Sequence, residues 1–237
     1  MNQATYEHIY SSKFFTDLEC DSALSKLNEN LDSCVQVNSI KMLGNPYYSH
    51  SLTNIEQTDD INLKHNQLML KEFSFFLSKL ISFFENHYQK KVITHEKVAL
   101  PGFHLIPSHP GYSQFKNFHF DLDYIEIGKV HPELGIDYKS QNKSFTILLS
   151  RNDDLDAGIQ YIPPHKSINQ EKLRNIKLSK AKILSSLFLY KTGYINIQES
   201  QMAHNVYYYN KSEQNIERIT MQGNLVETSH GDLLLYW

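Results

Sequence analysis

Residues 117–124 read Asn-Phe-His-Phe-Asp-Leu-Asp-Tyr, a run in which polar and apolar side chains alternate. Such alternation is typical of a β-strand, in which positions i and i+2 project from the same face. His119 and Asp121 would then point the same way, so that an imidazole and a carboxylate can meet one cation. The pair is weak evidence by itself, because the same spacing recurs at His230-Gly231-Asp232.

The residues after position 95 form short β-branched and aromatic runs that are separated by turn residues. This pattern of short runs and turns favours an antiparallel sandwich or barrel over alternating strand and helix units. We expect strands at 98–106, 118–127, 144–149, 158–162, 187–191, 194–198, 204–209, 218–222 and 233–237. The charged segment 167–181 interrupts the series as a helix or a long loop.

The first 95 residues are expected to be mainly helical. Leucines at 24, 27 and 31 mark a short amphipathic helix with Asp21 as its N-cap, and apolar residues three or four apart mark a longer helix over 62–88. The turn-rich residues 44–48 predict a loop between them. We therefore expect one domain over 1–237, with a helical region at 1–95 packed on a β core at 96–237.

Composition and charge narrow the function classes. The chain has 237 residues, 41% of them hydrophobic, and a net charge of −3, which would not attract a phosphate backbone. It has neither an apolar run of about 20 residues nor the basic and apolar regions of a signal peptide at its start. Two cysteines cannot build a disulfide framework. We expect a cytoplasmic protein without nucleic-acid or membrane partners.

The order and spacing of two later segments strengthen the interpretation of His119 and Asp121 as metal ligands. His204 precedes a predicted strand, and Arg218-Ile219-Thr220 follows fourteen residues later. Two histidines and one carboxylate on one side of a metal, with open positions opposite, are the ligand set of non-haem Fe(II) oxygenases. His119 and His204 can converge only if the sheet folds back on itself, as in a jelly roll (a double-stranded β-helix, cupin-like). His104 and His109 flank Pro107. They could line the cavity or lie in a loop, and we expect a loop.

The positions His119, Asp121, His204 and Arg218 together resemble the pattern of the 2-oxoglutarate- and Fe(II)-dependent dioxygenases over residues 96–237. The resemblance implies that Fe(II) binds the first three residues and that Arg218 and Thr220 hold the far carboxylate of 2-oxoglutarate. It also implies O2 as oxidant and a small-molecule or peptide substrate that is hydroxylated at a C–H bond. Asp121 favours hydroxylation over halogenation, because related halogenases have a small residue at that position.

The sequence leaves two other functions open. The chain can be a non-catalytic jelly-roll binding module that has lost iron, or a hydrolase that holds zinc in the same three residues. Iron content and turnover of 2-oxoglutarate separate the three possibilities.

Overall fold

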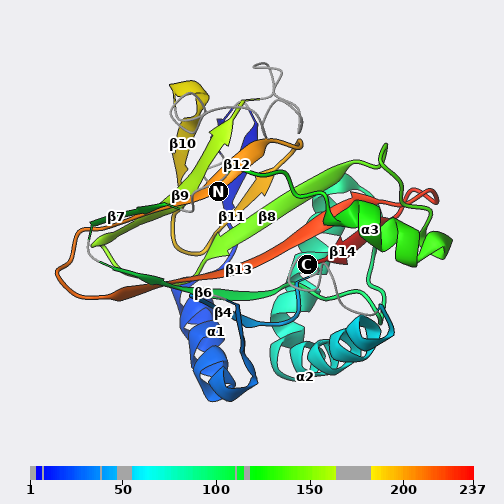
Figure 1. Cartoon of the computed structure of the whole chain (residues 1–237), viewed down its shortest axis with the longest axis horizontal. Helices are drawn as coiled ribbons and strands as arrows, with labels where there is room; N and C mark the ends of the chain where they lie inside the picture. The colour runs from blue at the N-terminus through cyan, green and yellow to red at the C-terminus, as the bar shows by residue number, and fades with distance from the viewer. Residues whose placement is uncertain are drawn as a thin grey trace.

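The part of the chain that the structure describes forms two sheets and a small number of helices (Figure 1). The structure is a computed structural model, and it describes residues 4–6, 8–37, 39–46, 55–109, 111–114, 118–163 and 183–237. Among these residues, no helix combines the length and the apolar character that crossing a membrane requires. The prediction of a mainly β chain with few helices is confirmed.

The larger sheet has ten strands. Its main path runs through β1 (Ala4–Tyr6), β2 (Ile9–Lys13), β11 (Tyr194–Gln198), β8 (Asn142–Leu148), β13 (Ile216–Glu227), β6 (Gly102–Ser108), β4 (Ile40–Leu43) and β3 (Val35–Val37). Off this path, β14 (Leu233–Tyr236) pairs antiparallel with β13 and parallel with β5 (Val92–Ile93).

The smaller sheet has four antiparallel strands, in the order β10 (Ser186–Leu189), β9 (Leu155–Ile162), β12 (Ala203–Asn210) and β7 (Gly111–Gln114). The chain crosses repeatedly between the sheets, since β6, β8, β11 and β13 belong to the larger one and β7, β9 and β12 to the smaller. An apolar cluster joins Ile106 and Leu148 of the larger sheet to Leu155, Ala157 and Tyr208 of the smaller. The functional residues described below lie between these layers.

Two helices, α1 (Asp17–Glu29) and α2 (Ile55–Tyr88), pack on the larger sheet (Figure 1). Phe84 of α2 lies 5.1 Å from Phe145 of β8, and Phe73 lies 4.7 Å from Phe103 of β6, measured between ring centroids. α2 bends at Phe73, whose backbone is non-helical at φ −120° and ψ 17°. The amphipathic spacing predicted over 62–88 is therefore confirmed, and its apolar face covers the sheet.

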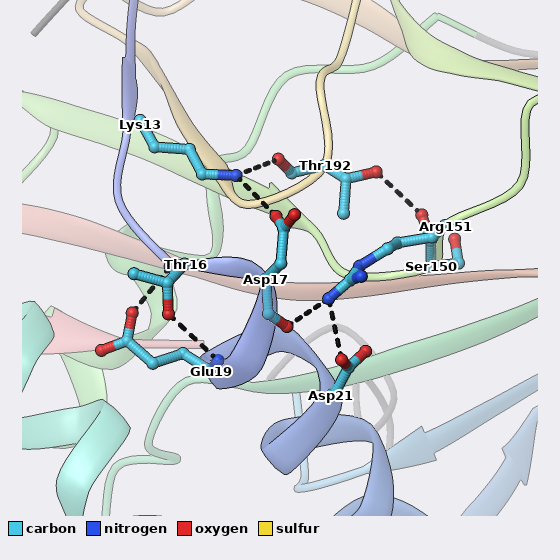
Figure 2. A network of polar contacts seen from close by, with 8 residues as sticks. All are labelled: Lys13, Thr16, Asp17, Glu19, Asp21, Ser150, Arg151 and Thr192. Atoms are coloured by element: carbon cyan, nitrogen blue, oxygen red, sulfur yellow. Dashed lines mark hydrogen bonds and ion pairs between the residues drawn. The ribbon is translucent and has the colours of Figure 1, made fainter.

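Polar contacts anchor the start of α1 against the loops of the sheet (Figure 2). Thr16 caps the helix by accepting from the Glu19 amide at 3.2 Å, while the Thr16 amide donates to the Glu19 carboxylate at 2.7 Å. Arg151 donates to the Asp17 carbonyl and pairs with Asp21 at 2.9 Å. The predicted N-cap at Asp21 is thus wrong, because Asp21 lies inside the helix and neutralises an arginine.

The expected strand at 118–127 is also wrong. His119 forms an isolated bridge, and α3 (Asp123–Val130) follows. Tyr124, Ile127 and Gly128 of α3 are buried at helical spacing, and the first two pack with residues of β13 and β14. Residues 117–124 alternate between polar and apolar side chains, which favours a strand. Burial of the apolar face of α3 against β13 and β14 favours the helix and outweighs this local pattern.

The other expected strands agree with β8 to β14, and the strand expected at 98–106 begins later, at Gly102. The region 1–95 is less helical than expected, because β1 to β5 lie in it and join the larger sheet. β2 carries few apolar residues: its Ser11 hydroxyl is buried and donates to the Asn196 side chain at 2.8 Å. The segment 167–181, and residues 47–48 of the expected loop, lie outside the described residues.

Candidate active site

Two histidines that are far apart in the sequence lie side by side. His204 is the second residue of β12, and His119 lies between β7 and α3. The His119 amide donates to the His204 carbonyl at 2.9 Å, and the His204 amide donates to the His119 carbonyl at 2.8 Å. Their ring centroids are 4.4 Å apart. This backbone pairing fixes the two imidazoles next to each other.

Asp121 completes the group. Its Oδ1 lies 3.7 Å from His119 Nε2 and 3.6 Å from His204 Nε2. One donor atom from each residue lies within 4.8 Å of the others. The structure therefore brings together the three residues that the sequence singled out as ligands. We call His119, Asp121 and His204 the triad.

Neighbouring groups orient two of the three ligands. Nδ1 of His204 lies 3.0 Å from the Met202 carbonyl, which can only accept, so Nδ1 carries the proton and the lone pair of Nε2 faces Asp121. The Ser144 hydroxyl donates to Oδ2 of Asp121, and Asn142 donates to the Asp121 backbone carbonyl at 3.1 Å. Oδ1 of Asp121 and Nε2 of His204 are thus left for a common partner.

The triad favours a charged carboxylate at Asp121. Burial raises the pKa of Asp121, but His204, His119 and the Ser144 hydroxyl together hold it below its usual value. At Asp123, burial and the nearby charge of Asp121 raise the pKa to about 6. One carboxylate in this pair is therefore poised as a ligand, while the other resists ionisation.

A cavity of about 480 Å³ adjoins the triad, and Arg218 of β13 lines it as well. Arg218 is 1% exposed, and neither Nε nor Nη1 has a hydrogen-bond partner among the described residues. Its Cζ lies 5.8 Å from the ring centroid of Tyr190, a favourable cation–π distance. Burial lowers the pKa of Arg218. A buried guanidinium with free donors is costly unless an anion binds it, so this site fits a carboxylate ligand.

Thr220 lies two residues along β13 and is fully buried, but it does not line the cavity. Its Oγ1 accepts from the Gln222 side chain at 2.7 Å, and Gln222 does line the cavity. The structure thus brings Arg218 to the cavity wall, while Thr220 contacts the cavity-lining residue Gln222.

The loop expected for His104 is wrong, and the alternative that the sequence left open, a place in the cavity lining, is what the structure has. His104 lies in β6, opposite Thr220 in the β6–β13 pairing, and lines the cavity rather than a loop. Burial, and secondarily the charge of Arg218, lower the pKa of His104 to about 3, so its imidazole is neutral. The spacing of His104 and Ile106 on one strand face was the available signal. His109, the other histidine expected in a loop, follows the end of β6 and contacts Asn215 at 3.1 Å.

Solved structures with the same fold exist at low sequence identity. The N-substituted L-amino acid dioxygenase from Burkholderia ambifaria AMMD aligns with a TM-score of 0.57 and 14% identity, over 97% of this chain and 86% of that one. Its complex with alpha-KG gives a TM-score of 0.53 at 11% identity over the same shares. EvdO2 from Micromonospora carbonacea var. aurantiaca gives 0.52 at 10% identity, over 93% and 86%. These likenesses show a shared fold.

No family model matches the chain, and no curated protein matches it in sequence. The functional interpretation therefore depends on the geometry of the site.

Proposed function

We propose that the chain is a non-haem Fe(II) oxygenase that couples the decarboxylation of 2-oxoglutarate to hydroxylation of a small-molecule or peptide substrate. The observation that carries the proposal is the buried guanidinium of Arg218, which lines the same cavity as the triad and whose Nε and Nη1 have no hydrogen-bond partner among the described residues. 2-Oxoglutarate would bind the metal through its keto acid end and would need a second group for its far carboxylate. A metal ligand set and a carboxylate-binding group within one cavity meet these two requirements. The arrangement of strands in two facing sheets supports a double-stranded β-helix core at 96–237 within a single domain.

His119, Asp121 and His204 are the residues that would hold Fe(II), through the nitrogens and the carboxylate oxygen that already face one another. Two neutral donors and one anion suit Fe(II), and three protein ligands leave positions for 2-oxoglutarate and O2. When bound, the iron would activate O2, and 2-oxoglutarate would be the co-reductant that is oxidised to succinate and carbon dioxide. The chain's own part is to fix the ligands and to keep water from the reacting atoms.

Arg218 would bind the distal carboxylate of 2-oxoglutarate through two parallel hydrogen bonds, for which a planar guanidinium is well suited. The neutral imidazole of His104 beside it adds no competing charge. Thr220 would support this end of the cavity through its contact with Gln222.

The rest of the cavity is suited to a largely apolar substrate with a few polar groups. Ile106, Ile159 and Val206 contribute apolar surface. Asn224 also lines the cavity, and its buried Oδ1 has no hydrogen-bond partner among the described residues. A substrate N–H or O–H can satisfy this acceptor.

The test measures iron content and succinate formation with Fe(II), ascorbate, 2-oxoglutarate and O2. The wild-type chain is expected to bind one Fe(II) at the triad and to form succinate slowly without substrate. His119→Ala and His204→Ala should each lose iron and turnover. His109→Ala is the matched control and should keep both, because His109 is exposed and outside the triad.

Iron-loaded protein that forms no succinate against a broad metabolite panel would favour the binding-module reading. Zinc bound at the triad, together with hydrolytic activity, would favour the hydrolase.

A further inference from the structure

A second group of metal-ligating side chains lies outside the cavity. His95 follows β5, and His131 and Glu133 flank Pro132 at the start of η3 (Pro132–Leu134), directly after α3. One donor atom from each of the three residues lies within 4.8 Å of the others. The two imidazole centroids are 4.8 Å apart. Segments separated by more than thirty residues in the chain thus direct three metal-ligating groups to one point.

The distances between the donor atoms fit a shared cation better than direct hydrogen bonds. Glu133 Oε1 lies 3.4 Å from His131 Nδ1 and 3.6 Å from His95 Nε2. Both separations exceed the roughly 2.7–3.2 Å of a hydrogen bond. Ligands about 2.0–2.1 Å from a tetrahedral zinc ion are about 3.3 Å apart, close to both values.

A carboxylate lies behind His131. The second nitrogen of His131, Nε2, faces Asp59 Oδ1 of α2 at 3.8 Å, an ion-pair distance that is longer than a hydrogen bond. When a metal binds Nδ1, a carboxylate on this side favours the ring with its proton on Nε2. Asp59 is held in turn by Lys97, whose Nζ lies 3.2 Å from Oδ2.

We propose that His95, His131 and Glu133 form a zinc site, with Asp59 behind His131 and a fourth coordination position open to water. Two imidazoles and one carboxylate are an established zinc ligand set. The His131 side chain is only 7% exposed, whereas that of Glu133 is 59% exposed, so the ion would enter from the surface at Glu133. The bound zinc would tie the chain after β5 to η3 and, through Asp59, to α2.

The experiment separates this site from the triad by using the full-length chain with His119→Ala and His204→Ala. After treatment with a chelator and equilibration with Zn²⁺, this double variant should retain one zinc per chain by elemental analysis. Co²⁺ in place of Zn²⁺ should give the intense visible bands of four-coordinate cobalt. Zinc should also raise the Tm of the double variant.

Glu133→Gln in the same background is the decisive variant, because Glu133 is exposed and its loss should not disturb folding. Zinc affinity should fall at least 100-fold, and the Tm shift should disappear. Asp59→Asn should weaken zinc binding by about 10–100-fold, as expected for a group behind a ligand. Glu126→Gln is the matched control: Glu126 is an exposed carboxylate of α3 that pairs with Lys129, and its loss should leave zinc binding unchanged.

A folded double variant that binds no zinc, or one whose zinc affinity is unaffected by Glu133→Gln, would overturn the proposal. A chain that binds zinc through Glu133 but forms no succinate in the wild-type form would instead contradict the proposed oxygenase and leave the zinc site intact. The two proposals therefore fail separately.

Discussion

Arg218 carries a buried charge that no described acidic residue neutralises, since no carboxylate lies within ion-pair distance of it. A buried cation without an anionic partner lowers the stability of the ligand-free protein. It should contribute favourably only when an anionic ligand binds it. We therefore expect substitutions of Arg218 to affect 2-oxoglutarate binding and the stability of the ligand-free protein in different ways.

Arg218→Ala should weaken the apparent affinity for 2-oxoglutarate by about 2–5 kcal/mol, which is roughly thirty-fold or more. Arg218→Lys should be intermediate, because it keeps the charge and loses the planar fork. Iron binding should survive in both, and Arg218→Met should leave the ligand-free protein no less stable to urea. Arg151→Ala, at a surface arginine, is the control for the affinity for 2-oxoglutarate, which it should leave unchanged. An unchanged 2-oxoglutarate dependence in Arg218→Ala would mean that the cosubstrate is anchored elsewhere.

His104 predicts a pH dependence of stability. Its pKa is about 3 in the folded chain against 6.5 for an ordinary histidine, so between these values the unfolded chain binds a proton that the folded chain does not. Stability must then fall as the pH decreases. From about pH 7.5 to about pH 5 the contribution is a loss of about 2 kcal/mol in the free energy of unfolding.

Urea unfolding across this pH range checks the prediction. His104→Gln should remove this part of the slope, whereas His109→Gln, at an exposed histidine, should keep it. Identical slopes in wild type and His104→Gln would show that folding leaves the pKa of His104 unchanged.

At the level of single elements, α1 shows how a short helix is fixed to a sheet. The capping box at Thr16 and Glu19 satisfies backbone donors at the start of the helix, and Arg151 connects its first turn to the loop after β8 (Figure 2). Cys20, Ala23 and Leu27 bury the opposite face. The polar contacts therefore set where the helix begins, and the apolar face sets how it is oriented.

Thr16→Ala should lower the free energy of unfolding by about 1 kcal/mol, because the Glu19 amide loses its acceptor. Ser25→Ala is the matched control: Ser25 is exposed within the same helix and makes only a 3.4 Å contact to Glu29. Its effect should stay within about 0.5 kcal/mol. Succinate formation should be unaffected in both, and equal losses of stability in the two variants would refute the capping role.

At the scale of the whole molecule, the cavity lies between two sheets that long-range pairing brings together. Ligands that bind the folded chain alone must stabilise it. Cosubstrate at a concentration one hundred times its Kd contributes about 2.7 kcal/mol, which is about 5–10 °C in Tm for a chain of this size.

Thermal unfolding without oxygen should therefore show two upward shifts, one with Fe(II) and a second with 2-oxoglutarate. Arg218→Ala should keep the first shift and lose most of the second, and His204→Ala should lose both. A full 2-oxoglutarate shift in the absence of any metal would contradict chelation at the triad.

Local sequence was sufficient for features that depend on periodicity and order. The apolar spacing over 62–88 predicted the long helix, the short β-branched runs predicted most strands after residue 100, and the order of His119, Asp121, His204 and Arg218 identified the residues that now line one cavity. The helix and the strands are encoded by neighbouring residues, because a helix or strand buries one face at a fixed repeat, whereas the four site residues were identified by their resemblance to a family pattern.

Only the tertiary structure decided the features that depend on contacts between distant segments. α3 replaced a strand because its apolar face is buried by β13 and β14, and β2 joined the sheet with few apolar residues because its polar groups are paired across strands. His104 lines the cavity because β6 pairs with β13, and His95 meets Glu133 because their segments pack together. In each case the deciding interaction is with residues far away in the sequence, which a local pattern cannot identify as partners.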